Sequence, residues 1–131
     1  MTPGPVVVDA SVLVDWFVRE ELAGAILLRI DGAALHAPAH VDHEVLSALG
    51  RLHRAGAVSA ATVSRHLEDL AEAPIERHPV APLVAGAWRR RQRLRLADAL
   101  YVELATELDV PLVTTDLRLA RTARIAEAVE V

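Results

Sequence analysis

The chain has 131 residues, a net charge of −4 and no cysteine, and 53% of its residues are hydrophobic. This hydrophobic content excludes a disordered chain, and the lack of cysteine excludes both a disulfide framework and a zinc–thiolate site. No apolar run approaches the roughly 18 residues that a membrane-spanning helix needs, and the N-terminus does not resemble a signal peptide. We therefore expect a cytoplasmic protein that forms one domain over residues 1–131.

The first part of the chain alternates between strand and helix patterns. The β-branched run at residues 5–9 predicts a buried strand. Ser11 is a candidate cap for a short helix reaching about Val18, and residues 20–30 form a second helix that Asp31-Gly32 stops. A brief strand is expected over residues 34–37.

Two helices and a strand are expected in the middle of the chain. Apolar residues recur at helical spacing in residues 41–55, and Gly56 is a natural end for this helix. Ser59 begins another helix, which ends before Pro74. Residues 75–78 then predict a strand.

The last third continues the alternation. Residues 82–93 and 97–108 predict helices, residues 112–114 a strand, residues 117–123 a short helix and residues 128–131 a final strand. Strands that alternate with helices favour a parallel sheet with helices on both faces. Aromatic residues make up only 3%, so a core of Val, Leu, Ile and Ala fits this α/β class.

Four carboxylates stand in four separate apolar segments: Asp9, Glu44, Asp98 and Asp116. Asp9 ends the first strand and Asp116 lies just beyond the strand at 112–114, so both belong at the carboxyl edge of the sheet, where ligands bind. Asp98 opens a helix that would point into the same crevice, and Glu44 can face inward from its own helix. Buried charges are costly unless they are paired or bind a metal, so we expect these acids to meet.

A cluster of acids without lysine suggests a hard divalent cation, Mg²⁺ or Mn²⁺. In two-metal sites the ions lie about 3.5–4 Å apart and clamp the attacking and leaving oxygens of a phosphoryl transfer. Hydrolysis of RNA or DNA is the natural reaction for such a site. The hydroxyls of Ser11 and Thr114 are suited to supporting Asp9 and Asp116.

The segments Val7-Val8-Asp9-Ala10-Ser11, Ala97-Asp98-Ala99-Leu100-Tyr101-Val102 and Leu112-Val113-Thr114-Thr115-Asp116, with Glu44 after Pro38, resemble the acidic motifs of PIN-domain ribonucleases. Length and motif order look most like VapC-type toxins of bacterial toxin–antitoxin pairs. The resemblance covers nearly the whole chain. One departure is Ser47, where the family often carries Asn three residues after its Glu.

The resemblance implies a PIN-like three-layer α/β/α fold with a mainly parallel sheet of four to five strands. It also implies an endoribonuclease in which Asp9, Glu44, Asp98 and Asp116 bind Mg²⁺ or Mn²⁺ while Thr114 assists. A small antitoxin would wrap an apolar groove, and we expect this groove on the early helices, at Val14, Trp16, Phe17, Leu22, Ile26 and Leu27. Homodimerisation is expected through other helices.

Other functions are less consistent with the residues. A phosphorelay receiver resembles this pattern but uses a lysine, and the chain has none. A haloacid-dehalogenase-like phosphatase needs Asp where Ser11 stands, and no Gly-x-Gly-x-x-Gly follows the first strand. The remaining alternative is a catalytically degenerate PIN-like domain that only binds nucleic acid or protein.

The arginine run Arg89, Arg90, Arg91, Arg93 and Arg95 leads directly into the Asp98 motif. We expect it to contact RNA phosphates, the alternative being a solvated helix end. We read Asp15 as a solvated residue or, at most, a supporting one. His36, His40 and His43 do not have the spacing of a metal-ligand set, so surface or loop positions are expected.

Overall fold

Three consecutive valines form the central strand of the computed structural model, which describes residues 3–131. This strand, β1 (Val6–Val8), is fully buried, as β-branched residues in a parallel sheet usually are. The other strands are β2 (Leu35–Pro38), β3 (Ile75–His78), β4 (Leu112–Thr114) and β5 (Ala126–Ala128). All neighbours pair in parallel in the order β3-β2-β1-β4-β5, which confirms the expected α/β class.

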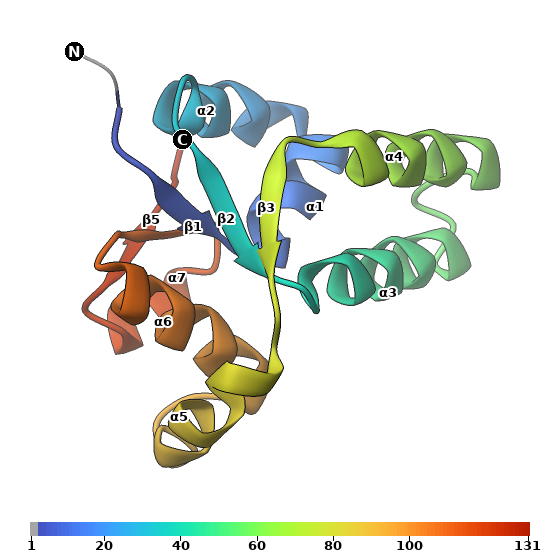
Figure 1. Cartoon of the computed structure of the whole chain (residues 1–131). Helices are drawn as coiled ribbons and strands as arrows, with labels where there is room; N and C mark the ends of the chain where they lie inside the picture. The colour runs from blue at the N-terminus through green and yellow to red at the C-terminus, as the bar shows by residue number, and fades with distance from the viewer. Residues whose placement is uncertain (1–2) are drawn as a thin grey trace.

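Helices cover both faces of the sheet (Figure 1). On one face, α1 (Ala10–Val18) and α2 (Glu20–Ile30) bury Val6 and Val8 against Ile26. On the other, α6 (Leu96–Leu108) and α7 (Leu117–Thr122) enclose Val7 and Leu112. The result is the three-layer α/β/α arrangement that the sequence predicts. Within residues 3–131, no helix is both long and apolar enough to cross a bilayer.

A helical hairpin extends beside the sheet, formed by α3 (Val41–Arg54) and α4 (Ala60–Glu72) (Figure 1). Gly56 ends the first helix with a φ of 80°, a left-handed conformation that glycine adopts without steric cost. The side chain of Ser59 accepts a hydrogen bond from the amide of Thr62 at 3.2 Å and so caps α4. The first turn of α3 follows β2 after only two residues, which places this turn near the carboxyl end of β2.

Three expected element boundaries were wrong. The helix expected over 82–93 is a 3-10 turn, Ala81–Leu83, followed by α5 (Val84–Arg89), and tight turns from Ala87 to Arg93 then break it. The last strand is Ala126–Ala128, since Ala126 and Ala128 pair with the two ends of β4. The cap of α1 is Asp9, and Ser11 lies in its first turn.

The strand order creates one topological switch point. From β1 the chain adds β2 and β3 on one side, then returns to add β4 and β5 on the other. At the carboxyl ends of β1 and β4 the following segments diverge, and ligands of open α/β sheets bind in such crevices. Asp9 follows β1 and Asp116 lies two residues beyond β4, so the topology brings both to this point.

Candidate active site

Asp9 is the most buried of the four acids, with 5% of its surface exposed. Its Oδ1 accepts hydrogen bonds from the Ser11 hydroxyl at 2.6 Å and the Val12 amide at 3.2 Å, while its Oδ2 accepts one from the Thr114 hydroxyl at 2.6 Å. Burial raises the pKa of Asp9 from 3.8 to about 6, although these three hydrogen bonds lower it in part. A cation in the cavity would offset the cost of this buried charge.

Two hydroxyls connect the ends of β1 and β4. Thr114 donates to Asp9 and accepts a hydrogen bond from the amide of Asp116 at 3.0 Å. The Ser11 hydroxyl lies 3.2 Å from that of Thr114 and accepts one from the amide of Thr115 at 3.1 Å. These contacts hold Asp9 and Asp116 at a fixed separation. Ser11 and Thr114 therefore lie where the sequence suggested, between the two acids that they are suited to support.

Asp98 and Asp116 are held beside two arginines. Asp116 caps α7 by accepting from the amides of Arg118 at 2.9 Å and Leu119 at 3.2 Å. The guanidinium of Arg118 lies 3.6 Å from Asp98 and 3.7 Å from Asp116. Arg95 donates to Asp98 at 3.2 Å, and this hydrogen bond raises the pKa of Arg95. Positive charge thus balances the two acids.

Glu44 is positioned by Tyr101 and His40. The Tyr101 hydroxyl donates to Glu44 Oε1 at 2.6 Å, and His40 Nε2 lies 3.4 Å from the same oxygen. The His40 and Tyr101 rings pack with centroids 4.6 Å apart. Burial, followed by the hydrogen bond to Glu44, raises the pKa of Tyr101 far above its usual value, so the phenol remains a donor. Glu44 is therefore held facing the cavity.

All four predicted acids line one cavity of about 270 Å³. They come from the end of β1, from α3, from the start of α6 and from the cap of α7. Oxygen ligands of this kind suit hard divalent cations, which can neutralise several carboxylates at once. The cavity therefore has a lining of the chemical kind that such cations prefer.

Several residues at this cavity were not predicted to act there. Of the two expectations for Asp15, the supporting one fits the structure, because Asp15 accepts a hydrogen bond from the Thr115 hydroxyl at 2.6 Å and lines the cavity. The roles of His40, Tyr101 and Arg118 were missed. Helical spacing could have identified two of them, since His40 precedes Glu44 by four residues and Tyr101 follows Asp98 by three. The contact of Arg118 depends on the tertiary structure, which brings the start of α7 close to Asp98.

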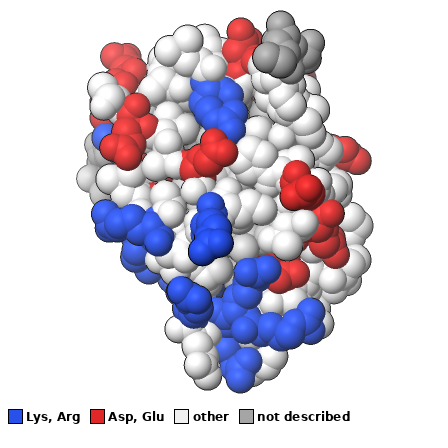
Figure 2. Space-filling model, turned by 90° about the vertical axis from the view of Figure 1, so that its left-hand side faces the viewer, with Lys and Arg blue, Asp and Glu red and all other residues white. Residues whose placement is uncertain are grey.

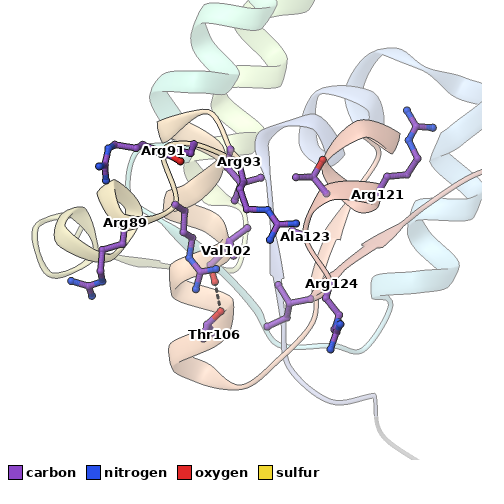
Figure 3. Close-up of a pocket in the computed structure, with 13 residues that line it drawn as sticks. Arg89, Arg91, Arg93, Val102, Thr106, Arg121, Ala123 and Arg124 are labelled. Carbon is purple, nitrogen blue, oxygen red and sulfur yellow. Dashed lines mark hydrogen bonds between the residues drawn. The ribbon is translucent and has the colours of Figure 1, made fainter.

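The predicted arginine run divides between two places. Arg95 lies at the acids, while the other four line a separate hollow of about 1130 Å³, with Arg121 and Arg124 on its far side (Figure 3). Arg90 is paired with Glu103 at 2.6 Å, and Arg91 lies over the Trp88 ring at 4.6 Å. The hollow has four further arginines, for which no ion pair is found within residues 3–131: Arg89, Arg93, Arg121 and Arg124. On the face of the molecule that Figure 2 shows, basic side chains gather in the lower half.

The histidines differ in part from expectation. His43 is exposed on α3, and His40 is in a turn, although its side chain is only 17% exposed. His36 lies within β2 and contacts Glu76 and His78, so its expected surface or loop position was wrong. This second cluster is distinct from the four acids.

Fold and cavity together define an α/β domain with an acid-lined crevice at its switch point, and comparisons with known proteins identify the same class. A family model for the PIN domain matches residues 6–125. The chain is 52% identical over 128 residues to Ribonuclease VapC3 of Mycobacterium tuberculosis, covering 97% of this chain and 93% of that protein. It is 35% identical to Ribonuclease VapC12 of the same species over 88% of this chain and 90% of that one.

Among solved structures, the crystal structure of PAE2754 from Pyrobaculum aerophilum matches with a TM-score of 0.70 and 27% identity. The match covers 95% of this chain and 83% of that one. The chain therefore belongs to the PIN domain family and, within it, to the VapC group, as the acidic motifs predict.

Proposed function

We propose that the protein is a metal-dependent endoribonuclease, the toxin of a toxin–antitoxin pair, that hydrolyses RNA phosphodiester bonds. One observation carries this proposal: four carboxylates from four separate elements line one cavity at the switch point of the sheet. The name ribonuclease that its relatives carry supports the choice of RNA. Residues 1–131 would act as a single nuclease domain, since the chain contributes strands to one sheet from Val6 to Ala128.

Asp9, Glu44, Asp98 and Asp116 would hold the cation, Mg²⁺ or Mn²⁺. When bound, such an ion lowers the pKa of water and stabilises charge on the phosphate. Ser11 and Thr114 hold both oxygens of Asp9 in place, and Tyr101 holds Glu44. Arg95 and Arg118 lie at the rim with exposed side chains, where they can meet the negative charge of the RNA backbone.

Purified protein should cut RNA into discrete fragments with Mg²⁺ or Mn²⁺ and lose this activity in chelator. Asp98→Asn should abolish cleavage, because it removes a charged ligand without changing side-chain size. Asp109→Asn is the matched control, since Asp109 is exposed and adopts a left-handed φ of 55° that Asn tolerates. Cleavage that persists in chelator or in Asp98→Asn would contradict the proposal. RNA binding without cleavage would favour the degenerate binding module.

Tyr101→Phe should lower the cleavage rate about 10- to 100-fold, the usual effect of losing a partner that orients a metal ligand. The ring still fills its buried site, so the protein should melt within a few degrees of the parent. The measurement is the rate as a function of Mg²⁺ concentration. Loss of affinity for Mg²⁺ is expected, and an unchanged Mg²⁺ dependence would show that Glu44 needs no support from Tyr101.

We also propose that an antitoxin binds the apolar groove beside α1. Trp16 and Phe17 line a cavity of about 510 Å³ together with residues of α4 and the start of β3. The expected groove needs two corrections. Leu22 and Ile26 are buried in the core and are not available to a partner. Val14 lines the cavity of the four acids instead. Leu27 is half-exposed, and so is Trp16.

A homodimer would use other helices. Leu46 on α3, Val84 and Trp88 on α5, and Leu96 on α6 each expose about half of their surface. Light scattering after size exclusion should give the mass of two chains at micromolar concentration. A mass of one chain would refute the dimer.

A further inference from the structure

We propose that His36, Glu76 and His78 form a second metal site, separate from the four acids, for a late first-row divalent cation such as Zn²⁺. Their ligand atoms all lie within 4.8 Å of one another. Two imidazole nitrogens and one carboxylate oxygen are a common ligand set for catalytic zinc, which keeps a further position for water. This inference is independent of the proposed ribonuclease function.

Backbone register brings the three side chains together. His36 on β2 pairs directly with Glu76 on β3, and Pro38 pairs with His78. Residues two apart on a strand point to the same face, and so do direct partners in neighbouring parallel strands. The amide of Ala39 also donates to the carbonyl of His78 at 2.7 Å, which holds the two strand ends together. The cluster thus follows from the pairing of β2 with β3.

The distances fit one bound ion. His36 Nδ1 lies 2.9 Å from His78 Nε2 and 3.2 Å from Glu76 Oε2, and His78 Nε2 lies 4.0 Å from the same oxygen. Ligands about 2.0–2.1 Å from a zinc ion lie at most about 4 Å apart, so all three can reach a common centre. The imidazoles are 17% and 22% exposed and the carboxylate 67%, which leaves the solvent side open.

Within residues 3–131, no guanidinium is paired with Glu76. Arg77 lies between Glu76 and His78 in sequence, but its side chain points to the opposite face. There it pairs with Asp42 at 3.0 Å and donates to the carbonyl of Leu70 at 2.6 Å. The nitrogen atoms close to the Glu76 carboxylate, among the side chains of residues 3–131, are those of His36 and His78.

The two sites should select different ions. Imidazole ligands favour Zn²⁺ over Mg²⁺, whereas an all-carboxylate set suits Mg²⁺ or Mn²⁺. An ion shared between β2 and β3 would tie the edge strand to its neighbour. Because α3 and its Glu44 follow β2, the ion would also stabilise the strand end that leads to the acids.

The test is calorimetric titration of the full chain with Zn²⁺ in excess Mg²⁺, in an Asp98→Asn/Asp116→Asn background that weakens the competing carboxylate site. We expect one equivalent of Zn²⁺ to bind. His36→Gln and His78→Gln, tested separately, should each weaken binding at least about tenfold, and Glu76→Gln less. Co²⁺ in place of Zn²⁺ should give a visible absorption band that both histidine variants lose.

His43→Gln is the matched control, because His43 is an exposed histidine outside the cluster. It should bind Zn²⁺ like the parent. Zn²⁺ should raise the melting temperature of the parent and the control, and not that of the histidine variants. Absence of Zn²⁺ binding in the parent, or unchanged affinity in both histidine variants, would overturn the proposal.

Discussion

Replacing Asp9 by Asn should abolish RNA cleavage and, in the absence of metal, make the protein more stable. The loss of activity is expected because a metal ion contributes several kcal/mol to the transition state, so loss of a ligand that holds it costs about 10³-fold in rate. The gain in stability is expected because Asp9 is a carboxylate buried in the core. The asparagine oxygen can still accept from Val12 and Ser11.

The direction of the pH dependence follows from the raised pKa. Burial raises the pKa of Asp9 from 3.8 to about 6, so between these values the folded protein binds a proton that the unfolded chain has lost. The free energy of unfolding therefore falls as pH rises through this window, and the cost of the charge is complete above it. For this shift the cost is on the order of 3 kcal/mol.

The measurement is denaturant unfolding of both proteins in chelator, from below pH 3.8 to above pH 6. The variant should be the more stable one above pH 6, with the difference shrinking toward pH 3.8. Asp109→Asn should show no such difference. A variant that is less stable than the parent throughout would mean that Asp9 is stabilised by its hydrogen bonds more than it is destabilised by burial.

Replacing Arg93 and Arg121 by Gln should weaken RNA binding and flatten its dependence on salt. Both are exposed, border the same hollow and have no ion pair within residues 3–131 (Figure 3). Each lost phosphate contact reduces the salt slope by about 0.7 for single strands. The double variant should therefore lose about 1.4 in slope, and on the order of 25-fold in affinity at 0.1 M salt.

The control is Arg54→Gln/Arg65→Gln, which removes the same charge from the exposed surface of the helical hairpin. Binding is measured on a catalytically inactive Asp98→Asn background, so that RNA stays intact. Equal slopes for the two double variants would show that the effect is one of net charge. A reduced slope for Arg93→Gln/Arg121→Gln alone would assign the RNA path to the hollow.

Much of this protein could be predicted from local patterns in its sequence. The valine run of β1, the Ser59 cap of α4 and the glycine end of α3 depend on neighbours a few residues away, so their signals are readable along the chain. The order of strands and helices predicted a parallel sheet, and the positions of the four acids predicted where they would meet. The resemblance to the PIN family rests on the same short motifs.

Contacts between distant segments required the tertiary structure. Local spacing places Tyr101 on the same helix face as Asp98 and Thr114 beside Asp116. Their partners Glu44 and Asp9 are 57 and 105 residues away, so only the packing of the elements reveals the two hydrogen bonds. The two arginine segments around the hollow are likewise separate in sequence. His36 meets His78 only because β2 and β3 pair in one register, and a shift of that register by one residue would turn the histidines to opposite faces. Side-chain type and local spacing determine which residues can act, whereas packing of the elements determines which of them meet.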